Sequence, residues 1–191
     1  NEINKIRKKH MINKVILLMP IIESVSGIEN VSSIARASEN IVALAIGLED
    51  YTASIGVSRT FEGRESFYAR SRLVVAAKAA GIQPIDSVFS DIDDLEGLKR
   101  SIIESRSLGF EGMGCIHPRQ IPVISEGFAP KEDEIEKAVK IIQAFEEAKS
   151  RGLGVVALGS KMIDAPVVAR AQKTIDLAVR LGKLSRNRAE D

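Results

Sequence analysis

Two carboxylates stand where two predicted strands end. Glu23 follows a continuous apolar run at residues 15–22, and Asp50 follows a second run at residues 41–46. The carboxyl ends of parallel strands open on one face, which is where barrel enzymes place their active sites. Because adjacent strands lie about 4.8 Å apart, the two side chains could share one ion. An oxygen-only pair with room for water suits Mg²⁺; alternatively, each acid caps the helix that follows it.

The residues beside these acids leave further alternatives open. Glu49 precedes Asp50 and competes for its role. Consecutive residues of an extended segment point to opposite faces, so only one of the two can point inward. Next to Glu23, Ser24 and Gly27 open a helix whose backbone N–H groups could hold a substrate carboxylate. Ordinary helix capping explains these residues equally well.

One histidine, His117, lies in the segment CIHPRQ after the last predicted strand. His10 is the only other histidine, which excludes a multi-histidine metal site. With Arg119 beside it, His117 could contact a phosphate or nucleotide, or it could be a structural residue that satisfies backbone groups before Pro118. We expect Cys115 to be buried on the strand, where it packs rather than reacts.

Two further segments carry polar groups that we interpret as structural. Asp164, in the segment SKMIDAP, precedes the last predicted helix and reads as its N-cap. The tract YARSR at residues 68–72 is interpreted as a helix surface that makes contacts rather than as a catalytic group.

Strands that alternate with helices must position these residues. We expect strands at residues 15–22, 41–46, 85–89 and 112–116, and helices at residues 27–37, 64–80 and 94–108 with Asp93 as the last N-cap. Continuous apolar runs are typical of strands buried on both faces of a parallel sheet. Such units fit half of a (β/α)8 barrel or a small doubly wound sheet. The fingerprint G-x-G-x-x-G is absent, which weighs against a nucleotide-binding sheet.

The composition changes after Pro130. Residues 131–151 predict an amphipathic helix, with one apolar face formed by Ile135, Val139, Ile142 and Phe145. A short turn-and-strand segment at residues 152–159 and a final helix at residues 164–184 follow. The boundary that we expect separates residues 1–129 from residues 130–191.

Composition excludes several classes of protein. Of 191 residues, 45% are hydrophobic and 28% charged, which argues for a globular chain rather than a disordered one. Lys and Arg number 27 against 26 Asp and Glu, so no net field favours nucleic acid or a membrane surface. The longest apolar run is too short to span a bilayer. A single cysteine suits a reducing compartment, and we expect a cytoplasmic protein without a secretory signal.

Five sequence blocks resemble successive blocks of the citrate lyase β-subunit family, which is HpcH/HpaI aldolase-like and includes malyl-CoA lyase. They are MPIIESVSG, ALAIGLEDYTASIG, YARSRLVVAAKAAGIQPIDSVFSDIDDLEGL, GFEGMGCIHPRQI and GSKMIDAPVVARA. The similarity runs from about residue 15 to about residue 184. The resemblance implies that residues 1–129 are the C-terminal part of a (β/α)8 TIM barrel, strands about five to eight, and that residues 130–191 are a C-terminal helical lid.

The resemblance also implies roles for individual residues. Glu23 and Asp50 match the family's Mg²⁺ ligands, and Glu23 thereby also takes part in catalysis and substrate binding. Asp164 matches an acid/base that the lid of a neighbouring subunit supplies. His117 matches a residue near the thioester carrier.

The activity that the resemblance implies is cleavage of a 3-hydroxyacyl thioester into an acetyl thioester and a 2-oxoacid such as oxaloacetate. The substrate would be a citryl-CoA, citryl-carrier-protein or malyl-CoA type of thioester, and the partners an acyl-CoA or acyl-carrier protein. A homo-oligomer, a trimer or hexamer, or a citrate lyase complex is expected. Residues 52–54 (TAS) depart from relatives that carry another Asp there, and the family's first three to four strands are not in this chain. The alternative is therefore a truncated, inactive paralogue that acts as an oligomeric or regulatory binding protein.

Overall fold

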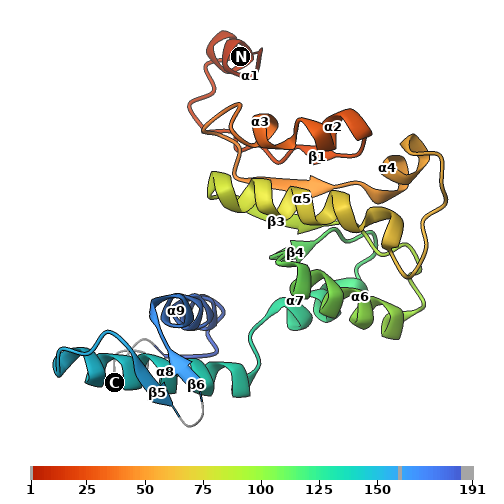
Figure 1. Cartoon of the computed structure of the whole chain (residues 1–191). Coiled ribbons are helices and arrows are strands. Elements are labelled where there is room, and N and C mark those ends of the chain that lie inside the picture. Colours follow the sequence, from red (N-terminus) through yellow and green to blue (C-terminus); the bar gives the residue numbers. More distant parts are fainter. Residues whose placement is uncertain (1, 159–160, 186–191) are drawn as a thin grey trace. The chain divides into compact units, whose positions relative to one another are not determined.

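The computed structural model describes residues 2–158 and 161–185, which form two compact units (Figure 1). The first unit comprises Asn1–Ile124 and the second Ser125–Asp191. Among the described residues, no helix is both long and apolar enough to cross a membrane.

A four-stranded parallel sheet forms the centre of the first unit. Its strands follow chain order, β1 (Ile21–Ile22), β2 (Ala43–Ile46), β3 (Gln83–Asp86) and β4 (Gly112–Met113). All three pairings are parallel, and an isolated bridge between Leu18 and Ile41 extends the first of them. The predicted parallel order of four strands is thereby confirmed, although each strand is shorter than its apolar run. The fold is α/β with a parallel sheet, as the alternation of elements predicts.

Burial differs between the first two strands. Every residue of β2 is buried, as expected for a strand covered on both faces. In the run at residues 15–22, only Ile22 is buried, and five side chains are exposed, namely Val15, Ile16, Leu17, Met19 and Ile21. The prediction of burial on both faces is therefore wrong for this run. The physical reason is its place at the edge of the described sheet, where it pairs with β2 on one side only.

Seven helices lie within the described part of the first unit or begin in it. Their bounds are α1 (Glu2–Lys9), α2 (Val25–Glu29), α3 (Val31–Ala35), α4 (Leu48–Ser54), α5 (Arg64–Ala80), α6 (Leu95–Leu108) and α7 (Gln120–Phe128). The long helix α5 contacts β2, β3 and α3, and its face Ala69, Leu73, Ala76 and Ala77 belongs to the core. Gly81 ends α5 in the left-handed conformation, with φ 72°, which glycine adopts without strain.

Three helical predictions need correction. The helix predicted at residues 27–37 is two helices that meet at Asn30, whose backbone has φ −99° and ψ 7° and whose side chain donates to the Ser26 carbonyl at 2.8 Å. Helix α6 begins one residue later than predicted: Asp94, not Asp93, is its N-cap and accepts from the Gly97 N–H at 2.7 Å. Helix α4 was not predicted at all.

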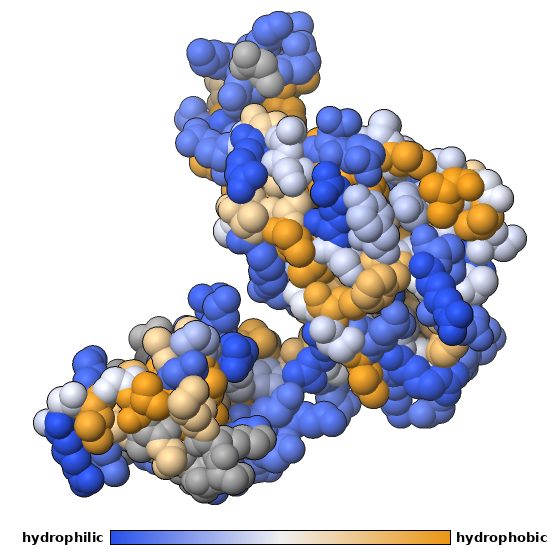
Figure 2. All heavy atoms as spheres, in the orientation of Figure 1, coloured by the Kyte–Doolittle hydropathy of each residue, from blue (hydrophilic) through white to orange (hydrophobic). Residues whose placement is uncertain are grey.

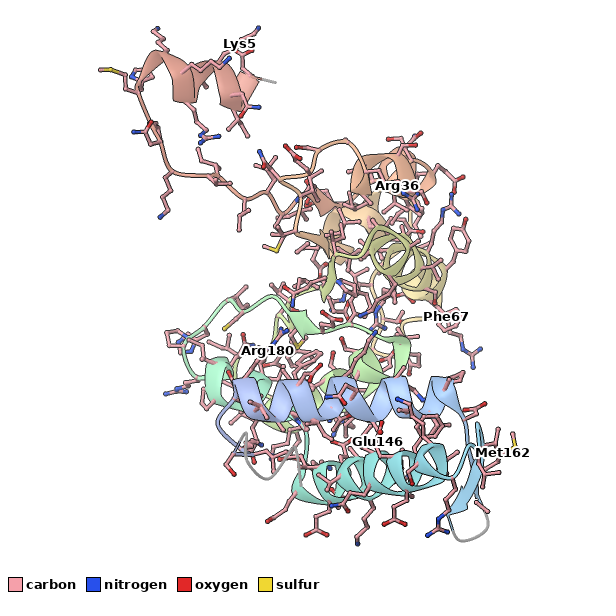
Figure 3. All side chains as sticks on the ribbon, turned by 90° about the vertical axis from the view of Figure 1, so that its left-hand side faces the viewer. Lys5, Arg36, Phe67, Glu146, Met162 and Arg180 are labelled. Atoms are coloured by element: carbon pink, nitrogen blue, oxygen red, sulfur yellow. The ribbon has the colours of Figure 1, made fainter. Side chains whose placement is uncertain are left out.

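The second unit is a helical hairpin with a small antiparallel ribbon. It contains α8 (Glu132–Ser150), β5 (Val156–Leu158), β6 (Lys161–Ile163) and α9 (Ala165–Arg180). Helices α8 and α9 pack against each other around Ile135, Ala138, Ile141, Ile163, Ala171, Ile175, Ala178 and Leu184. The amphipathic helix at residues 131–151 is confirmed by α8. Met162 on β6 is exposed and projects outward from this hairpin (Figure 3). On the face of the chain that Figure 2 shows, apolar and hydrophilic residues are interspersed.

Candidate functional site

Strand register brings Glu23 and Gly47 side by side at the carboxyl ends of β1 and β2. Ile22 is the partner of Ile46 in the parallel pairing. One residue further, the Gly47 N–H donates to the Ile22 carbonyl at 3.0 Å. Glu23 therefore leaves β1 beside the residue that begins the loop after β2.

The Glu23 side chain lies over Gly47. A Cβ added to Gly47 would stand 2.9 Å from both Cβ and Oε2 of Glu23, closer than real Cβ atoms approach other atoms. Gly47 has φ −103° and ψ 99°, a conformation open to any residue. Glycine is thus required here for space rather than for backbone freedom, and the space is filled by the Glu23 carboxylate.

Helix α4 carries the second acid, and Gly47 is its N-cap. Asp50 lies in the first turn and is exposed, and within the described part of the chain no hydrogen bond or ion pair holds its carboxylate. Glu49, its competitor, is paired with Arg59 at 3.0 Å between Oε1 and Nη1. The expectation that only one of the two acids points inward stays a prediction. Its premise, an extended segment, is wrong, because both residues lie in helix α4 and both are exposed.

The residues present fit a magnesium ion. Glu23 directly follows β1 and its side chain occupies the space over Gly47, and Asp50 lies in the first turn of the helix after β2, so each of two adjacent strands is followed by a carboxylate. No group of three or more His, Cys, Asp or Glu side chains in the described ranges could hold a metal ion. Two carboxylates completed by water and substrate oxygens match Mg²⁺, which keeps several waters and rarely takes a cage made only of protein.

Ser24 and Gly27 form the start of α2. The Ser24 hydroxyl accepts from the Gly27 N–H at 3.1 Å and lies 3.3 Å from the Ser26 hydroxyl. Helix capping, one of the two readings of these residues, is therefore present. A contact of this segment with a substrate carboxylate stays a prediction.

His117 lies in the loop between β4 and α7. Its carbonyl accepts from the Gln120 N–H at 3.0 Å, and its Nδ1 accepts from the Arg119 N–H at 3.2 Å. Gln120, fully buried, links this loop to the loop after β3 by donating to the Phe89 carbonyl at 2.9 Å. Cys115 is exposed, so its predicted burial is wrong: β4 ends at Met113, and Cys115 already belongs to the loop.

Asp164 lies in the second unit, between β6 and α9. Its Oδ1 accepts from the Val167 N–H at 3.2 Å, and Pro166 follows in the first turn. The N-cap reading is thereby confirmed. Asp164 is half-buried, and among the described residues its second carboxylate oxygen has no hydrogen bond. The acid/base role stays a prediction.

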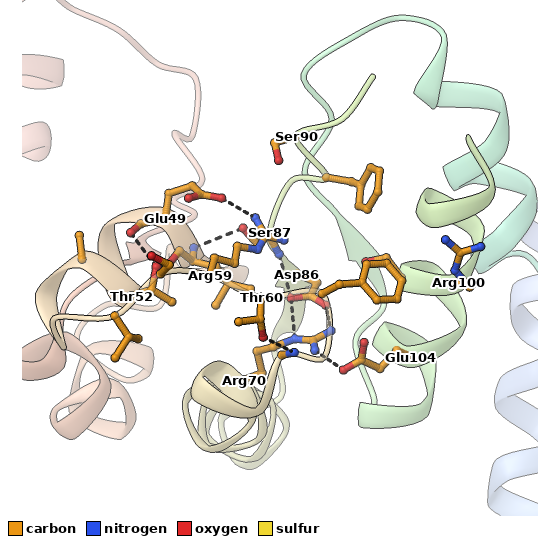
Figure 4. Close-up of a pocket in the computed structure, with 18 residues that line it drawn as sticks. Glu49, Thr52, Arg59, Thr60, Arg70, Asp86, Ser87, Ser90, Arg100 and Glu104 are labelled. Carbon is orange, nitrogen blue, oxygen red and sulfur yellow. Dashed lines mark hydrogen bonds and ion pairs between the residues drawn. The ribbon is translucent and has the colours of Figure 1, made fainter. Parts of the chain in front are cut away.

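A pocket of about 570 Å³ opens beside the carboxyl ends of β2 and β3, and its side chains come from α4, the loop before α5, and α6 (Figure 4). Beneath it Arg70 is buried and forms a double contact with Asp86, from Nη2 to Oδ2 at 2.6 Å and from Nε to Oδ1 at 3.3 Å. Its Nη1 also donates to Glu104 at 2.6 Å. Burial by itself would lower the pKa of Arg70, but Asp86 and Glu104 outweigh it and raise the pKa.

The sequence did not reveal this ion-pair network. The tract at residues 68–72 was expected to be a helix surface, but Arg70 is buried, which corrects that expectation for this residue. Its spacing held the clue, since Arg70 follows Ala69 and precedes Leu73 and Val74 on the buried face of α5. The partner Asp86 could be identified only once β3 and α5 were placed together.

Two other groups have shifted pKa values. Burial, with smaller contributions from Tyr68 and Glu29, raises the pKa of Tyr51 above 10.0. Burial by itself would raise the pKa of Glu65, but hydrogen bonds outweigh it and lower the pKa below 4.5. These bonds come from the N–H and hydroxyl of Thr60, at 2.9 and 2.8 Å.

The fold and the site define an α/β protein with acidic residues at the carboxyl ends of a parallel sheet. Residues 1–118 match the family described as HpcH/HpaI aldolase/citrate lyase, and the chain belongs to that family. It is 42% identical over 161 residues to citrate lyase subunit beta of Leuconostoc mesenteroides subsp. cremoris, covering 84% of this chain and 53% of the relative. It is 36% identical over 172 residues to human mitochondrial citramalyl-CoA lyase, covering 86% and 51%.

Solved structures show the same relationship. CitE of Mycobacterium tuberculosis, in complex with magnesium, acetoacetate and coenzyme A, matches with a TM-score of 0.73 and 28% identity, over 88% of this chain and 62% of that one. A citrate lyase from Burkholderia xenovorans LB400 matches with a TM-score of 0.86 and 22% identity, over 98% and 61%, which supports the fold alone. The chain spans about half the length of the curated relatives it matches.

Proposed function

We propose that this chain belongs to a Mg²⁺-dependent carbon–carbon lyase that cleaves a 3-hydroxyacyl thioester to an acetyl thioester and a 2-oxoacid. The observation that carries the proposal is a carboxylate after each of two adjacent strands, Glu23 directly after β1 and Asp50 in the first turn of the helix after β2, with the Glu23 side chain lying over Gly47. Relatives named citrate lyase subunit beta, citramalyl-CoA lyase and L-malyl-CoA/beta-methylmalyl-CoA lyase support this reaction class. So do relatives crystallised with magnesium and oxaloacetate or coenzyme A.

In this proposal, Glu23 and Asp50 hold the metal ion. Bound there, Mg²⁺ would act as a Lewis acid that stabilises the alkoxide formed when the substrate hydroxyl loses its proton, and would polarise the carbonyl that this oxygen becomes as the carbon–carbon bond breaks. Glu23 also orients the 2-oxoacid half of the substrate. Ser24 and Gly27, next to it, hold the substrate carboxylate at the start of α2.

The thioester half leaves as an enolate, which needs a proton. We assign that proton to Asp164, acting as acid/base from the second unit of a neighbouring subunit. His117, half-buried in the loop after β4, is proposed to contact the thioester carrier, which is CoA or an acyl-carrier protein. The substrate is then of the citryl-CoA, citryl-carrier-protein or malyl-CoA type.

The proposed architecture follows from these roles. Strands β1–β4 are the last strands of a (β/α)8 barrel within residues 1–129, and residues 130–191 are its lid. A lid residue that acts in a neighbouring subunit makes activity depend on assembly into a homo-oligomer, a trimer or hexamer, or a citrate lyase complex. The exclusion of water by such a lid strengthens electrostatic interactions in the site. We place the protein in the cytoplasm.

A pair of matched substitutions tests the metal site and the reaction together. Asp50→Asn removes one carboxylate charge from the site, whereas Glu49→Gln removes the neighbouring charge, which is paired with Arg59. We expect Asp50→Asn to abolish the Mg²⁺-dependent release of the 2-oxoacid, which is oxaloacetate from citryl-CoA and glyoxylate from malyl-CoA, each measured by coupled oxidation of NADH. Glu49→Gln should retain most of the activity. Equal effects of the two substitutions would refute the assignment of Asp50.

A further inference from the structure

Helix α4 begins without a cap of its own. Its N-cap, Gly47, has no side chain to accept the N–H groups of the first turn, which have no partner within the helix. Ser, Thr, Asp or Asn would ordinarily stand here. None fits, because the first carbon of any side chain would collide with Glu23.

A residue from the next strand supplies the missing acceptor. The Ser87 hydroxyl, directly after β3, accepts from the Leu48 N–H at 3.3 Å, and Leu48 is the first residue of α4. Ser87 is buried. Its own N–H donates to Asp86 Oδ1 at 2.9 Å, and Asp86 is clamped by Arg70 (Figure 4). The acceptor is therefore fixed in place by a buried ion pair.

We propose that Ser87 is a positioning residue for Asp50: it caps α4 from the neighbouring strand and so sets where the first turn, with Asp50 in it, begins. The requirement for a remote cap arises from the site itself, since the space that an ordinary N-cap would use is occupied by Glu23. Helix α4 has only seven residues, so it has little structure of its own to hold its first turn if the cap is lost. This inference rests on the proposed metal site at Glu23 and Asp50.

The experiment compares two buried serines in the full chain. Ser87→Ala removes the capping hydroxyl. Ser105→Ala removes a hydroxyl that is fully buried on α6 and has no hydrogen-bond partner among the described residues. Mn²⁺, used as the probe for the Mg²⁺ site, is titrated and its free fraction is measured by electron paramagnetic resonance. Amide hydrogen exchange at Leu48 is followed in the same samples without metal.

For Ser87→Ala we expect Mn²⁺ binding about tenfold weaker, the usual loss when a residue that orients a metal ligand is removed. Exchange at Leu48 should become faster. Ser105→Ala should change neither quantity, and Ser87→Thr, which keeps the hydroxyl, should restore both towards the wild-type values. Mn²⁺ affinity in Ser87→Ala equal to that in Ser105→Ala would overturn the positioning role.

The proposed metal site has its own control. Asp50→Ala should abolish the binding seen in the wild-type chain. If Asp50→Ala binds Mn²⁺ as the wild type does, the metal site is wrong and the inference falls with it. If Asp50→Ala loses binding while Ser87→Ala keeps it, the metal site stands and only the inference fails.

Discussion

The buried pair of Arg70 and Asp86 allows a quantitative prediction for Arg70→Met. The two side chains are 5% and 3% exposed, so the substitution leaves a carboxylate in the core without its cation. Breaking a buried pair by removing one partner costs roughly 3–5 kcal/mol. We expect the lower end, about 3 kcal/mol on that scale, for two reasons. The Ser87 N–H still donates to Asp86, and Glu104, which loses the same cation, is 43% exposed and can be hydrated.

Urea unfolding followed by tyrosine fluorescence measures this loss. The chain has no tryptophan, and its two tyrosines, Tyr51 and Tyr68, both lie in the first unit, so the fluorescence reports on that unit alone. With a urea dependence of about 2 kcal/mol per molar, a loss of about 3 kcal/mol lowers the midpoint by about 1.5 M. Arg72→Met, on the same helix, is the matched control.

Arg72 donates to two backbone carbonyls at the end of α2, each at 3.1 Å, and has no buried carboxylate as a partner. Its replacement should cost about 2 kcal/mol, about 1 kcal/mol for each of the two hydrogen bonds. If Arg70→Met lowers the midpoint no more than Arg72→Met does, the ion pair does not stabilise the first unit as reasoned. The double variant Arg70→Met, Asp86→Leu should regain much of the loss, because no buried charge then lacks a partner.

Three other changes have defined outcomes. Gly47→Ala should weaken Mn²⁺ binding strongly, because the added Cβ displaces the Glu23 carboxylate. Gly154→Ala is the control and should leave binding unchanged, because no atom lies within 4 Å of its added Cβ. In a complete enzyme, Asp164→Ala and Asp50→Ala should each be nearly inactive, and mixed oligomers of the two should regain part of the activity. Glu65 has a lowered pKa in the folded chain, so its ionised form stabilises the fold relative to Glu65→Gln. This added stability should be fully present above the ordinary pKa of 4.5 and should disappear as the pH falls through the lower pKa of the folded chain.

Each of these expectations has a contrary result. Unaltered Mn²⁺ affinity in Gly47→Ala would mean that the carboxylate above Gly47 is not a ligand. Absence of recovery in verified mixed oligomers would mean that Asp164 does not act across subunits. A stability difference between wild type and Glu65→Gln that persists at the lowest pH would show that it does not arise from ionisation.

Local sequence features predicted the elements whose determinants are also local. Helix α5 begins at Arg64 and ends at Ala80, within the predicted bounds, because its apolar spacing and the glycine that follows it act over a few residues. The parallel order of β1–β4 was predicted from apolar runs separated by helices. Predictions failed at helix ends, where Asp93 and Asp94 are both suitable N-caps by residue type and only Asp94 caps the helix, and at Asn30, where the backbone leaves the helical conformation.

The sequence by itself determined the fold class, the family and the placement of Glu23 and Asp50 after apolar strands. It could not reveal the reason for a glycine at position 47, which is that the Glu23 side chain fills the space above it. Nor could it predict that Ser87 caps α4. It also could not predict that Asp86 holds Arg70. These contacts join residues from different strands and helices, and they exist only in one register of the parallel sheet. Because a shift of one residue reverses the face to which every side chain of a strand points, only the tertiary structure decides them.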